Sequence, residues 1–214
     1  MGGPTSKLFV PLNGRPLLAH TLRALQKSSA VRWIVLVVRD RERAQAEALI
    51  RRHKITKALS PCLGGDSRTE SVAKGFAELP REVEWVLVHD GARPCLTPRL
   101  IRQAVQAAER HGAVACGLPA MLTVKAVDER REVRVTLDRD HLWFVQTPQV
   151  FRREWFAQAL ERADHRLTHF PDDAALLESA GFPVSMVSGD PLNVKVTTKE
   201  DLLLAGAILK SRMR

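Results

Sequence analysis

The residues best placed to do chemistry form the run His89-Asp90-Gly91-Ala92-Arg93-Pro94. This run closes the apolar stretch Val83 to His89, which reads as a buried strand. Ligands of α/β sheets bind beyond the carboxyl ends of the strands. A carboxylate in that position, beside a glycine, suits Mg²⁺, which prefers carboxylate oxygen together with nucleotide phosphates. Asp90 is therefore a candidate metal ligand, and an ordinary turn residue at a strand end is the open alternative.

Helices and strands alternate around this run. The residues 33–38 read WIVLVV, a continuous apolar run typical of a strand covered on both faces, and Pro16 opens a segment with leucines at helical spacing. Further helices are predicted at 39–53, at 72–79, at 98–110 with Thr97 as N-cap, from Arg152, from about Asp172 and from Lys199. Further strands are predicted at 83–89, 113–117, 184–187 and 193–196. The alternation predicts one α/β domain over 1–214 with a mostly parallel sheet flanked by helices.

The sequence pattern changes from Thr123 to Leu137. Apolar and polar residues alternate on both sides of a charged turn at Asp128 to Arg131, which predicts an antiparallel hairpin. An isolated two-stranded ribbon is marginal in water, so its apolar face needs a partner. We therefore expect an inserted hairpin arm over 121–140, and another subunit is the natural candidate to cover its apolar face.

Composition narrows the class of protein. The net charge of +9 suits nucleic acid, but it also suits phosphate-bearing substrates, and no basic stripe with interleaved aromatic residues is present. No apolar run reaches membrane-spanning length, and the first residues lack signal-peptide features, so we expect a cytoplasmic protein with no membrane partner. Cys62, Cys95 and Cys116 lie far apart and predict neither a disulfide framework nor a thiolate zinc site.

Short blocks of sequence, in order along nearly the whole chain, match one enzyme family. They are Lys7–Leu12, Gly14–Leu22, Gly64–Arg68 with Ser71–Val72, His89–Pro94, Thr136–Arg139, Gln146–Gln149, and Asn193–Thr197 before Glu200–Leu202. In these blocks the chain resembles the 2-C-methyl-D-erythritol 4-phosphate cytidylyltransferases of the non-mevalonate isoprenoid pathway. The combined match is far more specific than any single block.

The resemblance implies a Rossmann-like nucleotidyltransferase fold and a magnesium-dependent reaction. In the family, the phosphate of methylerythritol phosphate attacks the α-phosphorus of CTP and pyrophosphate leaves. Such transfers depend on positioning and on charge stabilisation. Asp90 matches the aspartate that holds the metal ion. Lys7 and Lys195 match catalytic lysines that flank the α-phosphate as point charges.

The same resemblance assigns residues that bind the two substrates. Gly65, Asp66 and Ser71 match positions that recognise cytosine and ribose, and glycine there permits close approach of the backbone. Thr123 and Arg139 match residues of the arm that hold methylerythritol phosphate in the partner subunit's site, where a guanidinium suits a phosphate. The resemblance therefore implies a homodimer whose sites are completed across the interface. Arg68 and Gly91 complete the set of nucleotide-binding candidates.

Plainer interpretations stand beside these roles. A solvated surface charge is the ordinary state of residues such as Lys7, Lys195 and Arg139, and a plain turn accounts for Gly65. His89 has no second histidine or acid at catalytic spacing, and a phosphate nucleophile needs no general base, so a satisfied strand-end histidine is favoured. Trp143 and the segment 147–149 are interpreted as structural.

Two features depart from the family pattern. The family opens with an apolar strand and a glycine-rich loop carrying an arginine, whereas Met1-Gly2-Gly3 matches only the end of that loop. We expect the natural protein to begin about 15 to 20 residues upstream, the length of one strand and one loop. Without that strand, its neighbours should have unpaired edges.

The second departure is Leu122, where the family usually has aspartate. It leaves open a cytidylyltransferase for another polyol phosphate, such as ribitol 5-phosphate. The missing loop leaves open a truncated, inactive homologue that serves as a binding subunit. Nucleic-acid binding is a third alternative, which would require steep salt dependence.

Overall fold

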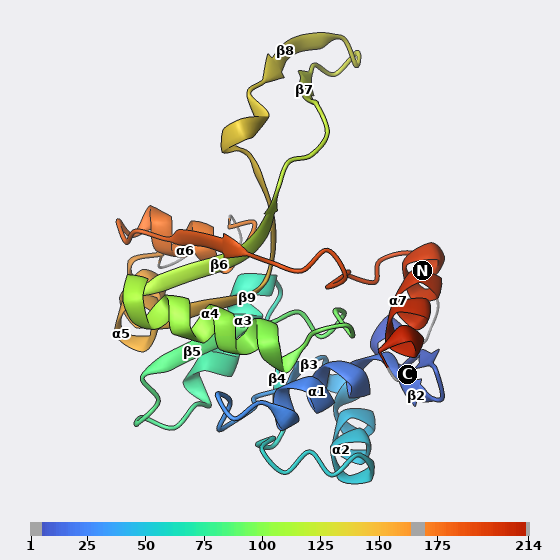
Figure 1. Ribbon diagram of the computed structural model, residues 1–214. Helices are drawn as coiled ribbons and strands as arrows, with labels where there is room; N and C mark the ends of the chain where they lie inside the picture. The colour runs from blue at the N-terminus through green and yellow to red at the C-terminus, as the bar shows by residue number, and fades with distance from the viewer. Residues whose placement is uncertain (1–5, 164–169, 213–214) are drawn as a thin grey trace.

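The computed structural model describes residues 6–163 and 170–212, so Met1-Gly2-Gly3 lies outside the described residues (Figure 1). The helices are α1 Leu17–Lys27, α2 Arg43–Arg52, α3 Arg68–Ala77, α4 Pro98–His111, α5 Arg153–Ala163, α6 Asp173–Ser179 and α7 Lys199–Ser211. The strands are β1 Pro11–Leu12, β2 Arg15–Pro16, β3 Val37–Val38, β4 Cys62–Leu63, β5 Trp85–Val88, β6 Ala113–Pro119, β7 Val124–Val127, β8 Val133–Leu137, β9 Trp143–Arg152 and β10 Ser185–Ser188. Short 3-10 helices span Lys7–Phe9, Asp40–Glu42 and Arg139–His141.

The main sheet is mixed, which corrects the expectation of a mostly parallel sheet. Its four strands lie in the order β10-β6-β9-β5. Strand β10 runs parallel to β6, whereas β9 runs antiparallel to both β5 and β6. The central position of β9 therefore makes two of the three strand pairs antiparallel, and the α/β class is retained.

Strand β9 was missed because its sequence does not look like a central strand. Pro148 interrupts the run, and proline cannot donate a hydrogen bond to a neighbouring strand. The structure accommodates Pro148, after a cis Thr147–Pro148 peptide bond, where the β6–β9 register shifts between Ala115 and Gly117. Bulges of this kind are among the few places where a sheet tolerates proline.

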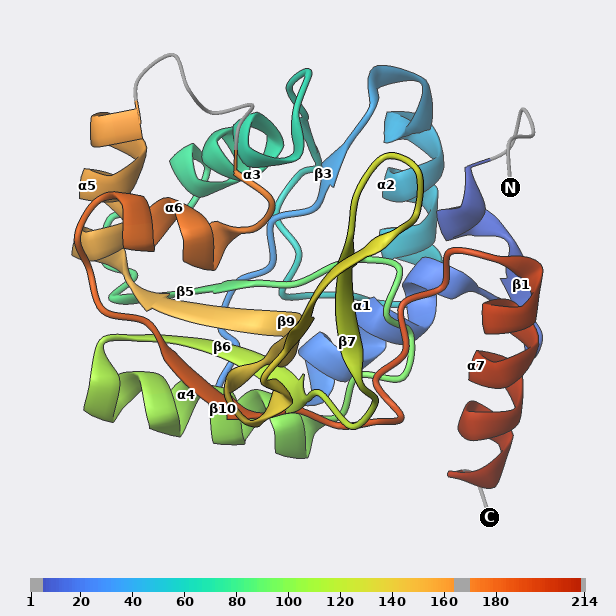
Figure 2. The same ribbon diagram turned by 90° about the horizontal axis from the view of Figure 1, so that it is seen from above.

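Helices cover both faces of this sheet, as the view from above shows (Figure 2). One core contains apolar residues of α1, α4 and β6, among them Leu22, Ile101 and Val114. A second core joins β5 and β9 to α5 and α6 through residues such as Phe151 and Phe156. The predicted N-cap of α4 is confirmed, because the Thr97 hydroxyl accepts a hydrogen bond from the Leu100 N–H.

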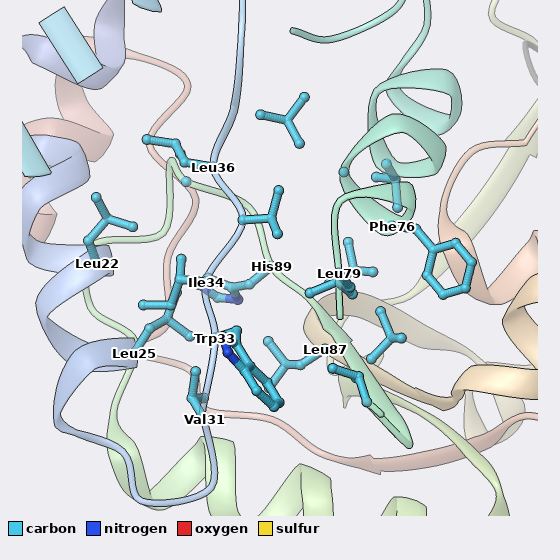
Figure 3. Close-up of a pocket in the computed structure, with 18 of the residues that line it drawn as sticks. Leu22, Leu25, Val31, Trp33, Ile34, Leu36, Phe76, Leu79, Leu87 and His89 are labelled. Atoms are coloured by element: carbon cyan, nitrogen blue, oxygen red, sulfur yellow. The ribbon is translucent and has the colours of Figure 1, made fainter. Parts of the chain in front are cut away.

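Strands β3 and β5 each have an edge without a neighbouring strand among the described residues. Strand β3 pairs with β4 and β5 pairs with β9. On their other side lies a cavity of about 510 Å³ with mainly apolar lining, including Trp33, Phe76 and Leu87 (Figure 3). The predicted strand 33–38 is shorter in the structure, where β3 spans Val37–Val38 and Ile34 adds an isolated bridge to Ala58.

The hairpin β7–β8 projects from the body of the molecule (Figure 1). Its antiparallel pairing confirms the predicted hairpin, with Val124 opposite Leu137. The predicted strand at 193–196 is wrong, because this segment is an irregular loop leading into α7. No described helix has both the length and the apolar character needed to cross a membrane.

Replacing Phe156 with alanine should destabilise the fold severely. Its fully buried ring stacks on Phe151 at 5.5 Å and meets Phe76 edge-on at 5.3 Å. Loss of such a ring costs about 3–5 kcal/mol, whereas surface changes cost less than about 0.5 kcal/mol. Urea unfolding of Phe156→Ala and of the control Leu203→Ala, whose side chain is 76% exposed, measures both values. Equal effects of the two substitutions would contradict this core.

Candidate active site

One cavity of about 1000 Å³ gathers most of the predicted site residues. Its walls are the segments that directly follow β3, β4 and β5, together with residues 6–8 and the loop before α7. Eight of the ten predicted residues line it: Lys7, Gly65, Asp66, Arg68, Ser71, Asp90, Gly91 and Lys195. Lys7 and Lys195, 188 positions apart in the sequence, therefore line the same cavity, and their proximity is a property of the fold.

Asp90 lies among three cationic side chains. Its Oδ2 accepts a hydrogen bond from Lys195 Nζ at 2.9 Å and lies 3.5 Å from Arg93 Nε. Its Oδ1 lies 3.8 Å from Arg68 Nε, which is longer than a hydrogen bond. One carboxylate oxygen is thus engaged, and the other faces a cation without a direct bond.

These charges control the ionisation of Asp90. Burial by itself raises the pKa of the carboxyl group, because it penalises the charged form. The hydrogen bond and positive charge of Lys195, with the charges of Arg68 and Arg93, outweigh burial and hold the pKa below its ordinary value. Asp90 is therefore an anion at neutral pH, as a metal ligand must be.

Strand β9 fixes the backbone at Asp90. The Asp90 N–H donates to Thr147 Oγ1 at 3.1 Å, and that hydroxyl also hydrogen-bonds His89 Nδ1 at 2.9 Å. The Thr21 hydroxyl donates to the Gly91 carbonyl at 3.0 Å. The His89 ring is only half satisfied, since its buried Nε2 has no hydrogen-bond partner among the described residues. This corrects the expectation of a satisfied histidine.

The loop carrying Gly64 and Gly65 is held by the first turn of α3. Gly65 N–H donates to Ser71 Oγ at 3.1 Å, and Ser67 forms a capping box with Glu70. A Cβ on Gly65 would lie 2.5 Å from the Glu70 Cβ, so a larger residue would not fit. Part of the role of Ser71 is therefore to shape this loop.

The loop that carries Lys195 is anchored on both sides. Buried Asn193 donates through Nδ2 to the Thr147 carbonyl at 2.7 Å and accepts from Arg93 Nη1 at 2.8 Å. The Val196 N–H donates to the Ala92 carbonyl at 2.8 Å. Lys195 itself remains exposed, so a fixed backbone presents a movable ammonium group to the cavity.

The two predicted acceptor-binding residues lie elsewhere. Thr123 and Arg139 belong to the exposed arm and do not line the cavity of their own chain. The Arg139 side chain donates through Nη1 to the Met121 carbonyl at 2.8 Å. The structure therefore separates these two residues from the other eight.

Sequence reasoning missed several charged residues at this site. Arg39 and Arg41 line the cavity directly after β3, and Arg93 contacts Asp90 from within the same run of sequence. The rule that ligands bind beyond strand ends could have found the first two, because they follow the apolar residues 33–38.

The metal-binding capacity of the site is small. No group of three or more His, Cys, Asp or Glu side chains that could hold a metal ion occurs in the part of the chain that the structure describes. A cation here would have Asp90 as its carboxylate ligand and would need other oxygens from a bound molecule or water. That donor set fits Mg²⁺, which commonly uses one or two carboxylates with substrate phosphates.

The pH dependence of stability should report on His89. Burial lowers its pKa from 6.5 to about 4. Between these values the unfolded chain binds a proton that the folded chain does not, so stability is full above the unfolded pKa and falls towards pH 4. The maximal loss is roughly 1.4 kcal/mol per pH unit. In urea unfolding at pH 7 and pH 5, His89→Asn should lose less stability than the parent chain. An identical loss in both chains would contradict this assignment.

Comparisons with known proteins show the family of the chain. A family model described as IspD: 2-C-methyl-D-erythritol 4-phosphate cytidylyltransferase matches residues 1–211. The chain is 39% identical to a protein of that name from Alkaliphilus metalliredigens, over 99% of this chain and 88% of that one. It is 41% identical to a protein of the same description from Pelotomaculum thermopropionicum, over 99% of this chain and 90% of that one.

Solved structures share the fold. A 4-diphosphocytidyl-2C-methyl-D-erythritol synthase from Anaerococcus prevotii superposes with a TM-score of 0.87 at 27% identity, covering 98% of this chain and 92% of that one. The 2-C-methyl-D-erythritol 4-phosphate cytidylyltransferase of Thermus thermophilus gives 0.78 at 30% identity, covering 95% and 93%. By sequence and by fold, the chain belongs to the 2-C-methyl-D-erythritol 4-phosphate cytidylyltransferase family.

Proposed function

We propose that this chain transfers the cytidylyl group of CTP to 2-C-methyl-D-erythritol 4-phosphate, giving 4-diphosphocytidyl-2-C-methyl-D-erythritol and pyrophosphate. Membership of the family supports the reaction. The observation that carries it at this site is the cluster of Asp90, Lys195, Arg68 and Arg93 beside the Gly64-Gly65 loop. A polyanionic triphosphate needs such charges, and a nucleobase needs a close backbone.

The transfer reaction does not require a protein side chain as general acid or general base. An oxygen of the acceptor phosphate forms a bond to the α-phosphorus of CTP, and the bond from that phosphorus to the bridging oxygen of pyrophosphate breaks. The attacking phosphate oxygen is already ionised, so no general base is required. Lys7 and Lys195 contribute positive charge where the transition state gathers negative charge.

Lys195 must exchange partners during this reaction. Its ammonium group bonds the Asp90 carboxylate at 2.9 Å, and a bound α-phosphate would compete for the same group. Asp90, released from that bond, would hold Mg²⁺ together with phosphate oxygens of CTP. The magnesium ion would offset phosphate charge and orient the triphosphate. Because CTP is a cytoplasmic metabolite, the proposal includes a cytoplasmic location.

Recognition of the base is assigned to the loop before α3. Gly65 and Asp66 line the cavity together with Ser71 of the first turn of α3, and Gly91 lines it as well. Gly65 carries no side chain, so its backbone can lie close to a planar ring. This arrangement supports CTP as the nucleotide.

The arm supports a homodimer with shared sites. It is a two-stranded ribbon whose apolar side chains are largely in solvent, including Met121 at 76% and Leu122 at 78% exposure. A second copy of the chain would cover them. In such a dimer Thr123 and Arg139 would contact the acceptor in the partner subunit's site, which accounts for their distance from their own cavity.

Pyrophosphate release tests the reaction and the acceptor together. The chain with CTP and Mg²⁺ should release pyrophosphate with methylerythritol phosphate and give at most background release with ribitol 5-phosphate. Asp90→Asn, which keeps the shape of the side chain but removes its charge, should lower the rate by at least about a hundredfold. Preference for ribitol phosphate would reject the acceptor, and no release with either acceptor would favour an inactive homologue.

Mixing two defective chains tests the shared site. Asp90→Asn damages the cavity, and Arg139→Ala damages the arm, so each homodimer should be nearly inactive. After mixing and subunit exchange, half of the dimers are hybrids with one intact site of two, so activity should recover to roughly a quarter of the parent value. Substitution of both residues in one chain, mixed with Arg139→Ala, is the control and should recover nothing. Absence of recovery in the first mixture, with exchange verified, would reject arm sharing.

A further inference from the structure

Arg68 joins two carboxylates at the edge of the site. Its Nη2 donates to Asp173 Oδ2 at 2.7 Å, and its Nε lies 3.8 Å from Asp90 Oδ1. Asp173 lies 105 residues away in the sequence, in the first turn of α6, and is fully buried. One guanidinium therefore connects a buried anion with the proposed metal ligand.

Burying the Asp173 carboxylate costs free energy, so the residue does not simply stabilise α6. Burial raises the pKa of its carboxyl group, and the charge of Arg68 only partly compensates. Its Oδ1 has no hydrogen-bond partner among the described residues. Buried ion pairs are often no more stable than apolar replacements, so this pair calls for another explanation.

The helix terminus itself is held by other residues. Asp172 caps α6 by accepting from the Ala175 N–H at 2.9 Å. Gln149 of β9 accepts from the Ala174 N–H at 3.1 Å and donates to Asp172 Oδ2 at 3.0 Å. Asp173 takes no part in these bonds, and its side chain accepts a hydrogen bond from Arg68 instead.

We propose that Asp173 is a positioning residue that holds the Arg68 guanidinium away from Asp90 and so keeps Asp90 Oδ1 available to a divalent cation. The proposal rests on the metal role of Asp90 in the proposed function. A guanidinium and a carboxylate at this separation would otherwise close into a bidentate pair. Anchored through Nη2, Arg68 instead stops at 3.8 Å, beyond hydrogen-bond distance.

Loss of the anchor has a specific consequence. Without the charge of Asp173, Arg68 can turn fully onto Asp90 and compete with the cation for the same oxygens. More Mg²⁺ is then needed to bind CTP, while saturating Mg²⁺ restores the normal affinity. A merely structural role of Asp173 would lower the amount of folded protein without raising the Mg²⁺ requirement.

Calorimetric titration of CTP into the full chain, without acceptor and at a series of Mg²⁺ concentrations, measures this requirement apart from turnover. In Asp173→Asn the Mg²⁺ concentration for half-maximal CTP binding should rise roughly tenfold, the equivalent of one charged hydrogen bond. Asp173→Glu, which keeps the charge but moves it by one methylene, should give a smaller rise. Asp172→Asn carries the same charge change one residue away. It keeps an oxygen for the Ala175 N–H, loses the bond from Gln149 Nε2, and should match the Mg²⁺ requirement of the parent chain.

Arg68→Met supplies the decisive background. Because Asp173 acts through Arg68, adding Asp173→Asn to Arg68→Met should change the Mg²⁺ requirement no further. The double variant removes the charges of both Arg68 and Asp173, so it leaves no unpaired buried charge and still reports whether Asp173 acts through Arg68. Should Asp173→Asn alone fail to fold, Asp173→Glu takes its place, and a parent-like requirement in it overturns the proposal.

Three further results would also overturn the proposal: a parent-like requirement in Asp173→Asn, an equal rise in Asp172→Asn, or an undiminished rise in the Arg68→Met background. Failure of the proposed metal role is recognised separately. In that case Asp90→Asn leaves the Mg²⁺ requirement for CTP binding unchanged. If Asp173→Asn nevertheless raises that requirement, the rise does not act through Asp90, and the positioning role is overturned as well.

Discussion

The rest of the site depends on one electrostatic constraint, a half-buried carboxylate that stays ionised. Burial opposes the charge of Asp90, and the cations Lys195, Arg68 and Arg93 outweigh that cost. These cations come from a loop, a helix and the strand-end segment, so the carboxylate fixes how several elements meet. Substrate phosphates would attract the same cations away from Asp90, so the charge around this carboxylate would change when substrate binds.

Strand β9 connects this electrostatic centre to the fold. Through Thr147 it hydrogen-bonds the Asp90 backbone and, through its carbonyl, the Asn193 side chain that anchors the Lys195 loop. Through Gln149 it holds the first turn of α6, next to Asp173. Strand β9 places no charged side chain next to Asp90, yet its hydrogen bonds help to position the charges around that carboxylate.

Much of the site could be predicted from sequence, and the failures have physical causes. Residues after apolar runs, such as Asp90, are found by the strand-end rule, and the Thr123–Leu137 hairpin by its alternation. Strand β9 was missed because Pro148 breaks its pattern and a bulge accommodates it. The Arg68–Asp173 pair was not predictable, because it joins residues 105 positions apart with no local pattern.

The most direct test of the central claim is a crystal structure with CTP and Mn²⁺, whose anomalous scattering locates the ion. The account predicts an anomalous peak at about 2.0–2.3 Å from an Asp90 oxygen, by analogy with hard divalent cations, and in contact with CTP phosphate oxygens. Lys195 should then have left Asp90 for the α-phosphate. A manganese ion bound away from Asp90, with the Lys195–Asp90 bond intact beside bound CTP, would contradict the account.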